Sequence, residues 1–452
     1  MTDPAPGGYA RRLGVFDATM LVIGGIIGAG IFLNPAVVAQ RAPTVALTLG
    51  VWVLGGAVAL AGAFVFAELG ARQPDAGGGY VYLRDGLSPL VGFLYGWTEL
   101  LVINSGGIAA VAVTFARYAT DLGGAPDGSI VPVAIGAIVL LSAVNLLGIK
   151  PGAVVQNVLT VLKLAALGAL ILLGLFWPAS SAAPAAPAAS AAPFFLIAIG
   201  TALIPVLFAY GGWQSTNFVA AEMKEPRRDL PRALVVGVGI VVTVYVLANL
   251  VYVKTLGVGG LAASRAPAAD VMRHLFGEGG ARFIAVGVAI STFGFLNLAI
   301  LSAPRVYQAM AADGVFFGRA ARLNDRYRVP ATALLLQSAW AVLLIATKSY
   351  GALLDYVVFG DWIFFGLVGV VLFVYRRRER GGAGSGTLHF RSPAYPWVPG
   401  FFVLAAAFAV ISTVASNPAN AALGGAIIAA GIPAYLWWKR TSQVSAGGRN
   451  PD

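Results

Sequence analysis

The stretch "IGGIIGAGIF", Ile23–Phe32, places four glycines among apolar residues inside a segment long enough to cross a membrane. Glycine is a poor helix former, and backbone N–H and C=O groups in the hydrocarbon core have no water to bond. The pair Gly24 and Gly28 suits close helix packing, but Gly25 and Gly30 weaken a helix more than packing requires. A phosphate-binding loop would need a soluble strand–turn–helix context, which is absent here. The stretch therefore predicts a helix that is interrupted within the membrane.

The composition is that of an integral membrane protein. Of the 452 residues, 58% are hydrophobic and 11% are charged, and the mean hydropathy is +0.82. A soluble domain has about 25% charged residues. The net charge of +11 follows from the positive-inside rule, which concentrates Lys and Arg in cytoplasmic loops. No nucleic-acid partner is therefore expected.

The chain offers few residues for catalytic or metal chemistry. It has no cysteine and only two histidines, His274 and His389, both in connecting segments. No disulfide or thiolate ligand is available, and no clustered His or Cys or paired carboxylates indicate an enzyme. We expect neither an enzymatic activity nor a cofactor or metal.

Runs of about 20 apolar residues predict twelve membrane spans. The first follows Arg11 and Arg12 and is too long for a cleaved signal peptide. Segments on the same side as the N-terminus contain most of the Lys and Arg residues, which predicts both termini in the cytoplasm. The predicted spans are 16–39, 44–70, 88–119, 130–148, 153–177, 194–221, 232–256, 280–311, 331–347, 352–375, 397–415 and 420–438.

A second interruption, "FAYGGW" at 208–213, lies in the sixth predicted span, five spans after the first. Glycine-interrupted spans at matching positions of two inverted halves indicate the binding site of a secondary transporter. The spacing predicts inverted repeats at 16–177 (spans 1–5) and 194–376 (spans 6–10). The other predicted segments are a cytoplasmic tail 1–15, an external Ala/Pro linker 178–193, a cytoplasmic loop 377–396, the last two spans at 397–438 and a cytoplasmic tail 439–452.

Together the two breaks predict a site for a zwitterion. Where a helix restarts, its free N–H groups and positive dipole end favour an anion. Where a half-helix stops, its free carbonyls favour a cation. Two broken helices side by side therefore suit the carboxylate and the ammonium of an α-amino acid.

Polar side chains inside the spans are further candidates. Lys163 lies deep in the fifth span, where a cation is costly and usually faces the bundle interior. We hypothesise that it caps free carbonyls at a helix break and replaces a coupling ion. Glu68 and Glu99 are interpreted as structural. Five others either line the pocket or bond between helices, and the sequence leaves both open: Asn104, Ser105, Asn297, Ser302 and Asp361.

Six segments carry a family resemblance: "GGIIGAGIF" (24–32), "AELGARQPDAGGGYVYLRD" (67–85), "FLYGWTELLV" (93–102), "NVLTVLKL" (157–164), "FAYGGWQSTNFVAAEMKEPRRDLPRAL" (208–234) and "RVYQAMAADGVFF" (305–317). They resemble the L-amino-acid transporter (LAT) family of the amino acid–polyamine–organocation (APC) superfamily, over about residues 10–440. The resemblance implies an all-α integral membrane protein with the LeuT-type fold. That fold has twelve transmembrane helices, a 5+5 inverted repeat and broken helices 1 and 6. The composition suits a bacterial member.

Position by position, the resemblance implies that a substrate carboxylate meets the backbone amides of Gly28, Ala29 and Gly30. The amino group would meet the carbonyls of Ile26 and Phe208, and Phe208 would be an aromatic gate. Many family members have Ser where this chain has Ala29, so a side-chain contact to the carboxylate is lost while the backbone amides remain. The expected substrate-binding residues are Ile26, Gly28, Ala29, Gly30, Asn104, Ser105, Phe208, Ala209, Gly211, Trp213 and Gln214, with Phe208 and Lys163 in gating and coupling.

Lys163 also matches a family lysine that occupies the place of a sodium site in sodium-coupled relatives. The resemblance therefore implies sodium-independent transport of neutral L-amino acids, as exchange, by alternating access in a cell (inner) membrane. Animal members pair with a single-span glycoprotein through a disulfide, which a chain without cysteine cannot form. Its expected partners are amino-acid substrates and the lipid bilayer.

Two other functions stay open at this point. One is a proton-coupled or cationic amino-acid permease, for which Asp361 would supply a pocket carboxylate. The other is a membrane sensor that binds amino acids without moving them, which the lack of an appended signalling domain disfavours.

Overall fold

The computed structural model describes residues 8–177, 195–347, 350–380 and 390–447, and within these residues every regular element is a helix. An isolated parallel bridge joins Leu13 to Met223. The elements are α1 (Val15–Ile26), α2 (Gly30–Arg41), α3 (Val45–Arg72), α4 (Gly79–Gly86), α5 (Pro89–Thr98), η1 (Glu99–Ile103), α6 (Asn104–Gly123), η2 (Asp127–Ser129), α7 (Ile130–Leu146), α8 (Ile149–Phe176), α9 (Phe195–Ala209), α10 (Ser215–Phe218), η3 (Ala220–Glu222), α11 (Pro226–Ala263), α12 (Pro267–Ser302), α13 (Pro304–Ala312), η4 (Gly318–Ala321), α14 (Ala331–Ala346), α15 (Tyr350–Arg380), α16 (Trp397–Ser416) and α17 (Pro418–Gly447).

These helices confirm the predicted all-α membrane fold. Among the described residues, nine helices are long and apolar enough to cross a membrane, or ten if α1 and α2 form one bent span. Two shorter apolar helices, Ile199–Ala209 and Ala331–Ala346, lie where the sixth and ninth spans are predicted. The count of twelve spans and the inverted repeat stay predictions.

One predicted segment, the loop 377–396, begins later in the structure for a physical reason. The linker 178–193 lies outside the described residues, as do parts of both tails and of the loop 377–396. The loop was expected to begin at 377, yet α15 continues to Arg380. Basic side chains in the last turn complement the helix dipole, and Arg376 also forms an ion pair with the buried Glu68, 2.7 Å between Nη2 and Oε2.

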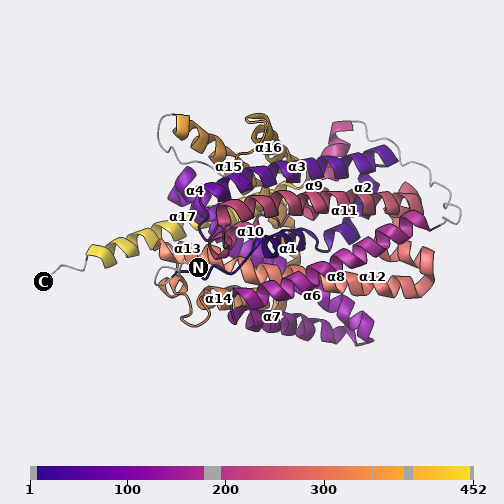
Figure 1. Cartoon of the computed structure of the whole chain (residues 1–452), viewed down its shortest axis with the longest axis horizontal. Helices are drawn as coiled ribbons and strands as arrows, with labels where there is room; N and C mark the ends of the chain where they lie inside the picture. The colour runs from indigo at the N-terminus through magenta and orange to yellow at the C-terminus, as the bar shows by residue number, and fades with distance from the viewer. Residues whose placement is uncertain (1–7, 178–194, 348–349, 381–389, 448–452) are drawn as a thin grey trace.

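The two predicted breaks lie together in the bundle. α1 and α2 are bent by 41° at their break, and the five residues 210–214 separate α9 from α10. Packing joins α2 to α9 and α1 to α10, so the first half of each broken helix lies against the second half of the other (Figure 1). This antiparallel pairing is what an inverted repeat produces.

Prolines in the two broken helices leave carbonyl groups without a backbone donor, and side chains donate hydrogen bonds to these carbonyls instead. Pro35 has no N–H for the carbonyl of Ile31, which instead accepts a hydrogen bond from the hydroxyl of Tyr252 at 3.3 Å. Pro205 likewise has no N–H for the carbonyl of Thr201, which instead accepts a hydrogen bond from Arg41 at 2.6 Å. These bonds hold α2 against α9 and α11 and thereby fix the second half of the first broken helix.

Candidate functional site

The first break leaves backbone amides free. α1 ends at Ile26, and the amide of Gly28 donates back to the Ile26 carbonyl at 2.9 Å. The amides of Ala29 and Gly30, at the start of α2, have no acceptor among the described residues. Free amides at a helix start attract an anion. The structure therefore presents two free amides, those of Ala29 and Gly30. The amide of Gly28 can bind an anion only after its hydrogen bond to the Ile26 carbonyl breaks.

The second break removes a helical hydrogen bond. The amide of Gly211 donates to the carbonyl of Phe208 at 3.2 Å, so the carbonyl of Leu207 loses its regular donor. The amide of Gly212 is held by the side chain of Gln214, 2.9 Å from Oε1. Gly212 has φ of 109°, a conformation that glycine adopts without strain. The chain thus turns at Gly212 and restarts as α10.

A cavity of about 130 Å³ lies between the two breaks. A single water needs about 10–15 Å³ on this scale, so the cavity has room for a small organic molecule. Its wall is formed by Ile26, Gly28, Ala29, Gly30, Ile103, Asn104, Gly107, Val111, Leu207, Phe208, Ala209, Gly211, Gly212, Gln214, Ser215, Phe295, Ala299, Asp361, Trp362 and Phe365.

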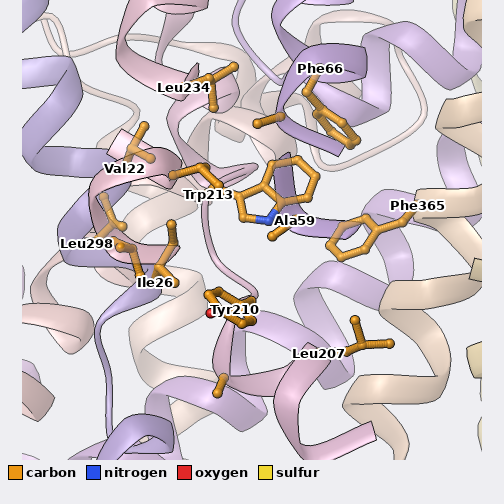
Figure 2. Packing of buried hydrophobic residues seen from close by; sticks show 14 of the residues in the cluster. Val22, Ile26, Ala59, Phe66, Leu207, Tyr210, Trp213, Leu234, Leu298 and Phe365 are labelled. Carbon is orange, nitrogen blue, oxygen red and sulfur yellow. The ribbon is translucent and has the colours of Figure 1, made fainter. Parts of the chain in front are cut away.

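Nine of the eleven predicted substrate-binding residues line this cavity, and Phe208 among them is 44% exposed. Trp213 does not line the cavity, because its ring packs behind the wall. Its centroid lies 4.8 Å from Phe66 and 5.5 Å from Phe365. Figure 2 shows the indole beside these two rings. Trp213 therefore supports Phe365, which does face the cavity.

Ser105 also does not line the cavity. It follows Asn104 by one residue, and one residue turns a helix by about 100°, so Ser105 is buried among the helices. Asn297 and Ser302 bond to helix carbonyls instead, with Asn297 donating to Gly152 at 3.1 Å and Ser302 to Leu298 at 2.8 Å. Of the five polar candidates, Asn104 and Asp361 reach the cavity.

Lys163 lies behind the first break. Its Nζ donates to the carbonyls of Ile27 at 2.7 Å, Gly24 at 3.1 Å and Ser291 at 3.2 Å. The side chain is fully buried and does not line the cavity. These bonds place Lys163 at carbonyls of the first break, and its role in place of a coupling ion stays a hypothesis.

Two residues that contact the first break are not predicted from the sequence. Ser291 Oγ lies 3.0 Å from the Ile27 carbonyl and 3.2 Å from that of Gly28. The hydroxyl of Tyr245 donates to the carbonyl of Ile26 at 3.0 Å. Hydroxyls are common inside membrane helices, so neither residue carries a signal of its own. Each becomes visible only when its distance to the break is known.

Comparison with known proteins then identifies the family. A profile of the amino acid permease family matches residues 13–437. The chain belongs to that family. The serine/threonine exchanger SteT of Bacillus subtilis is 30% identical over 96% of this chain and 98% of its own length.

Two further relatives agree. The mouse large neutral amino acids transporter small subunit 2 is 31% identical over 96% of this chain and 83% of its own length. The human b(0,+)-type amino acid transporter 1 is 29% identical over 83% of this chain and 79% of its own length. The expected LAT-type membership of the APC superfamily is confirmed, and the protein is a multi-pass membrane transporter rather than an enzyme.

The permease is closed at the end of the bundle that holds the start of α1. Leu13 exchanges backbone hydrogen bonds with Glu222 and Lys224, at 3.0 and 2.9 Å. The Glu222 carboxylate pairs with Arg305, 2.7 Å from Nε to Oε1, and both side chains are 1% exposed. Tyr9 covers this pair with its ring 5.9 Å from the guanidinium, and burial raises the pKa of its phenol above the usual range.

Proposed function

We propose that this permease exchanges neutral L-amino acids across a cell membrane by alternating access, without sodium. The observation that carries the proposal is the cavity between two helix breaks, with the free amides of Ala29 and Gly30 in its wall. These amides suit the carboxylate of an amino acid. The carbonyl of Leu207, without its helical donor, offers an acceptor for the amino group on the opposite wall.

The names of the relatives support the same reaction. One is called a serine/threonine exchanger, and another a large neutral amino acids transporter subunit. The cavity wall is mostly apolar: α6 contributes a glycine, and α12 and α15 contribute aromatic rings. Such a wall leaves room for an uncharged side chain beyond the zwitterionic head.

Independence of sodium rests on Lys163. Its ammonium already provides a positive charge to three carbonyl oxygens at 2.7–3.2 Å. A sodium ion at the same carbonyls would meet a like charge in a low-dielectric interior, which is strongly unfavourable. The fixed cation therefore replaces a coupling ion.

The proposal includes topology and partners. The permease acts without a disulfide-linked subunit, since it has no cysteine. Both termini lie on the cytoplasmic side of a bacterial inner membrane, as the distribution of Lys and Arg favours. The chain enters α1 from the same end of the bundle at which α17 finishes (Figure 1).

Proteoliposomes test the reaction. Vesicles preloaded with an unlabelled neutral amino acid should take up labelled amino acid at least about tenfold faster than empty vesicles, with or without sodium. Equal uptake into empty vesicles under a proton gradient would favour a symporter instead. A counterflow panel of amino acids then identifies the substrates.

A variant pair tests the site. Gly28→Leu should abolish binding, because a Cβ at Gly28 already lies 3.4 Å from the Phe295 ring and a longer side chain must enter the cavity. Gly136→Leu introduces the same side chain on the exposed face of α7 and should leave binding unchanged. Retained affinity in Gly28→Leu would place the substrate elsewhere.

A further inference from the structure

Two carboxyl groups lie near each other at the cavity, one in its wall and one behind it. Glu99 begins the π-helical turn η1, and Asp361 lies in α15, which packs against η1. The preceding residues lie close together, since a Cβ added to Gly360 would lie 3.3 Å from Cγ2 of Thr98. The two carboxyl groups interact electrostatically with each other. Asp361 lines the cavity, and Glu99 lies behind it with 1% exposure.

Each carboxyl group has an oxygen without a donor. Oε1 of Glu99 and Oδ1 of Asp361 are both buried and have no donor at hydrogen-bonding geometry within the described residues. The phenol of Tyr95 lies near Glu99 and interacts with its carboxyl group. The other oxygen of Glu99 accepts from the amide of Asn104, which also lines the cavity. A buried polar atom without a partner is costly, and a buried ionised carboxylate without a partner costs more.

Cationic groups do not compensate this pair. The titratable groups that interact with it are the phenols of Tyr95, from α5, and Tyr307, from α13. Among the described residues, no Lys or Arg forms an ion pair with Glu99 or Asp361. Charged groups on α15 and on the elements packed against η1 and α15 have other partners or lie towards helix ends: Glu68 and Arg72 of α3, Arg84 and Asp85 of α4, Arg117 and Asp121 of α6, Arg376, Arg377, Arg378, Glu379 and Arg380 of α15, and Lys439 and Arg440 of α17.

We propose that Glu99 and Asp361 bind one exchangeable proton between them and form a proton site in the wall of the substrate cavity. Two neighbouring carboxylates in a low-dielectric site do not both ionise readily, because like charges disfavour each other. The proton comes from solvent, bonds to one carboxyl oxygen and leaves by the same route. A substrate ammonium group does not fit this role, since both unpartnered oxygens are buried below the cavity surface.

The consequence for transport rests on the proposed function. A substrate in the cavity shields Asp361 from water, and loss of solvation favours the neutral, protonated form. Substrate binding therefore takes up a proton, and by linkage the proton strengthens substrate binding. Where the pair titrates, the substrate Kd should rise with pH, by at most about tenfold per pH unit for one proton.

Infrared difference spectroscopy of the intact permease tests the proton directly. A protonated carboxyl has a C=O stretch that a carboxylate lacks, and it should be present at neutral pH and titrate as one proton. Labelling the glutamates or the aspartates with ¹³C should shift this band in the unmutated protein. The band should be lost in both Glu99→Gln and Asp361→Asn. Absence of the band in the labelled, unmutated permease would overturn the proposal.

Binding measurements at pH 5 to 9 test the linkage. The unmutated permease and Glu225→Gln, which changes a side chain with 63% exposure, should show the same pH-dependent Kd, and Asp361→Asn should show a flat one. Substrate binding and exchange that are independent of pH in the unmutated permease would refute the linkage and leave the proposed function standing. Absence of amino-acid binding at every pH would refute the proposed function, while the infrared band would still report on the proton.

Discussion

Lys163 is the residue whose role the sequence and the structure describe most similarly. A lysine deep in an apolar span is expensive, so its position alone indicates a partner inside the bundle. The structure supplies three carbonyl partners, two of them in α1 or its break. What the sequence does not contain is the identity of the third, Ser291, because α12 comes beside α8 only in the folded bundle.

Replacing Lys163 with Ala should impair exchange. Hydrogen bonds to a charged group contribute about 1.5–3 kcal/mol each, and the loss of even one corresponds to about a 10–100-fold smaller population of the binding conformation. We expect the initial rate of exchange to fall by at least about tenfold. Lys150→Ala is the matched control on the same helix, since Lys150 is 44% exposed and pairs with Asp17 at 2.8 Å. Equal rates in the two variants would show that Lys163 has no mechanistic role.

At the scale of elements, the two helix breaks can be predicted from the sequence, but the contact between them cannot. Clusters of glycine in two apolar spans predict both breaks, because glycine weakens helices wherever it gathers. The contact between the breaks is not encoded in either stretch. A Cβ at Gly212 would lie 2.1 Å from the carbonyl oxygen of Gly25, and one at Gly30 would lie 2.9 Å from Cα of Ala209. These glycines let two backbones touch, and that requirement is visible only in the folded bundle.

The same limit explains why two of the predicted substrate-binding residues do not line the cavity. The resemblance orders residues along the chain, so it places Trp213 beside Phe208 and Ser105 beside Asn104. It contains no information on which way a residue points after a break. Trp213 turns into an aromatic cluster with Phe66, while Glu99, interpreted as structural from the sequence, lies directly behind the cavity wall.

Adjacent glycines of the second break should respond differently to alanine. Gly212→Ala forces a side chain into the left-handed region at φ of 109° and against the Gly25 carbonyl. Overpacking alone costs about 1–3 kcal/mol, so Tm should fall and substrate binding should be lost. In Gly211→Ala the nearest atom to the new Cβ is the Phe208 carbonyl oxygen at 3.4 Å, an ordinary contact, so Tm should fall less than in Gly212→Ala. An equal fall in Tm in both variants would contradict a specific contact between the breaks.

At the scale of the whole molecule, the structure has one end of the bundle closed. Glu222 of η3 pairs there with Arg305 of α13, and the backbone of Leu13 bonds to Glu222 and Lys224 beside this pair. In the proposed alternating access this end opens, and we expect the buried ion pair to separate when it does. A buried pair that loses one partner is destabilised by about 3–5 kcal/mol, and this cost applies only while the end is closed.

Arg305→Ala should therefore shift the permease toward the conformation that is open at this end. The chain has no native cysteine, so a single Thr216→Cys reports on access: Thr216 lies on α10, fully buried next to the cavity. In inverted membrane vesicles, a membrane-impermeant maleimide should label this cysteine at least about tenfold faster when Arg305 is Ala. Arg228→Ala is the control, because its pair with Glu225 is exposed and contributes at most about 1 kcal/mol. If both variants label at the rate of the parent, the Glu222–Arg305 pair does not hold this end closed, and the backbone bonds of Leu13 must do so instead.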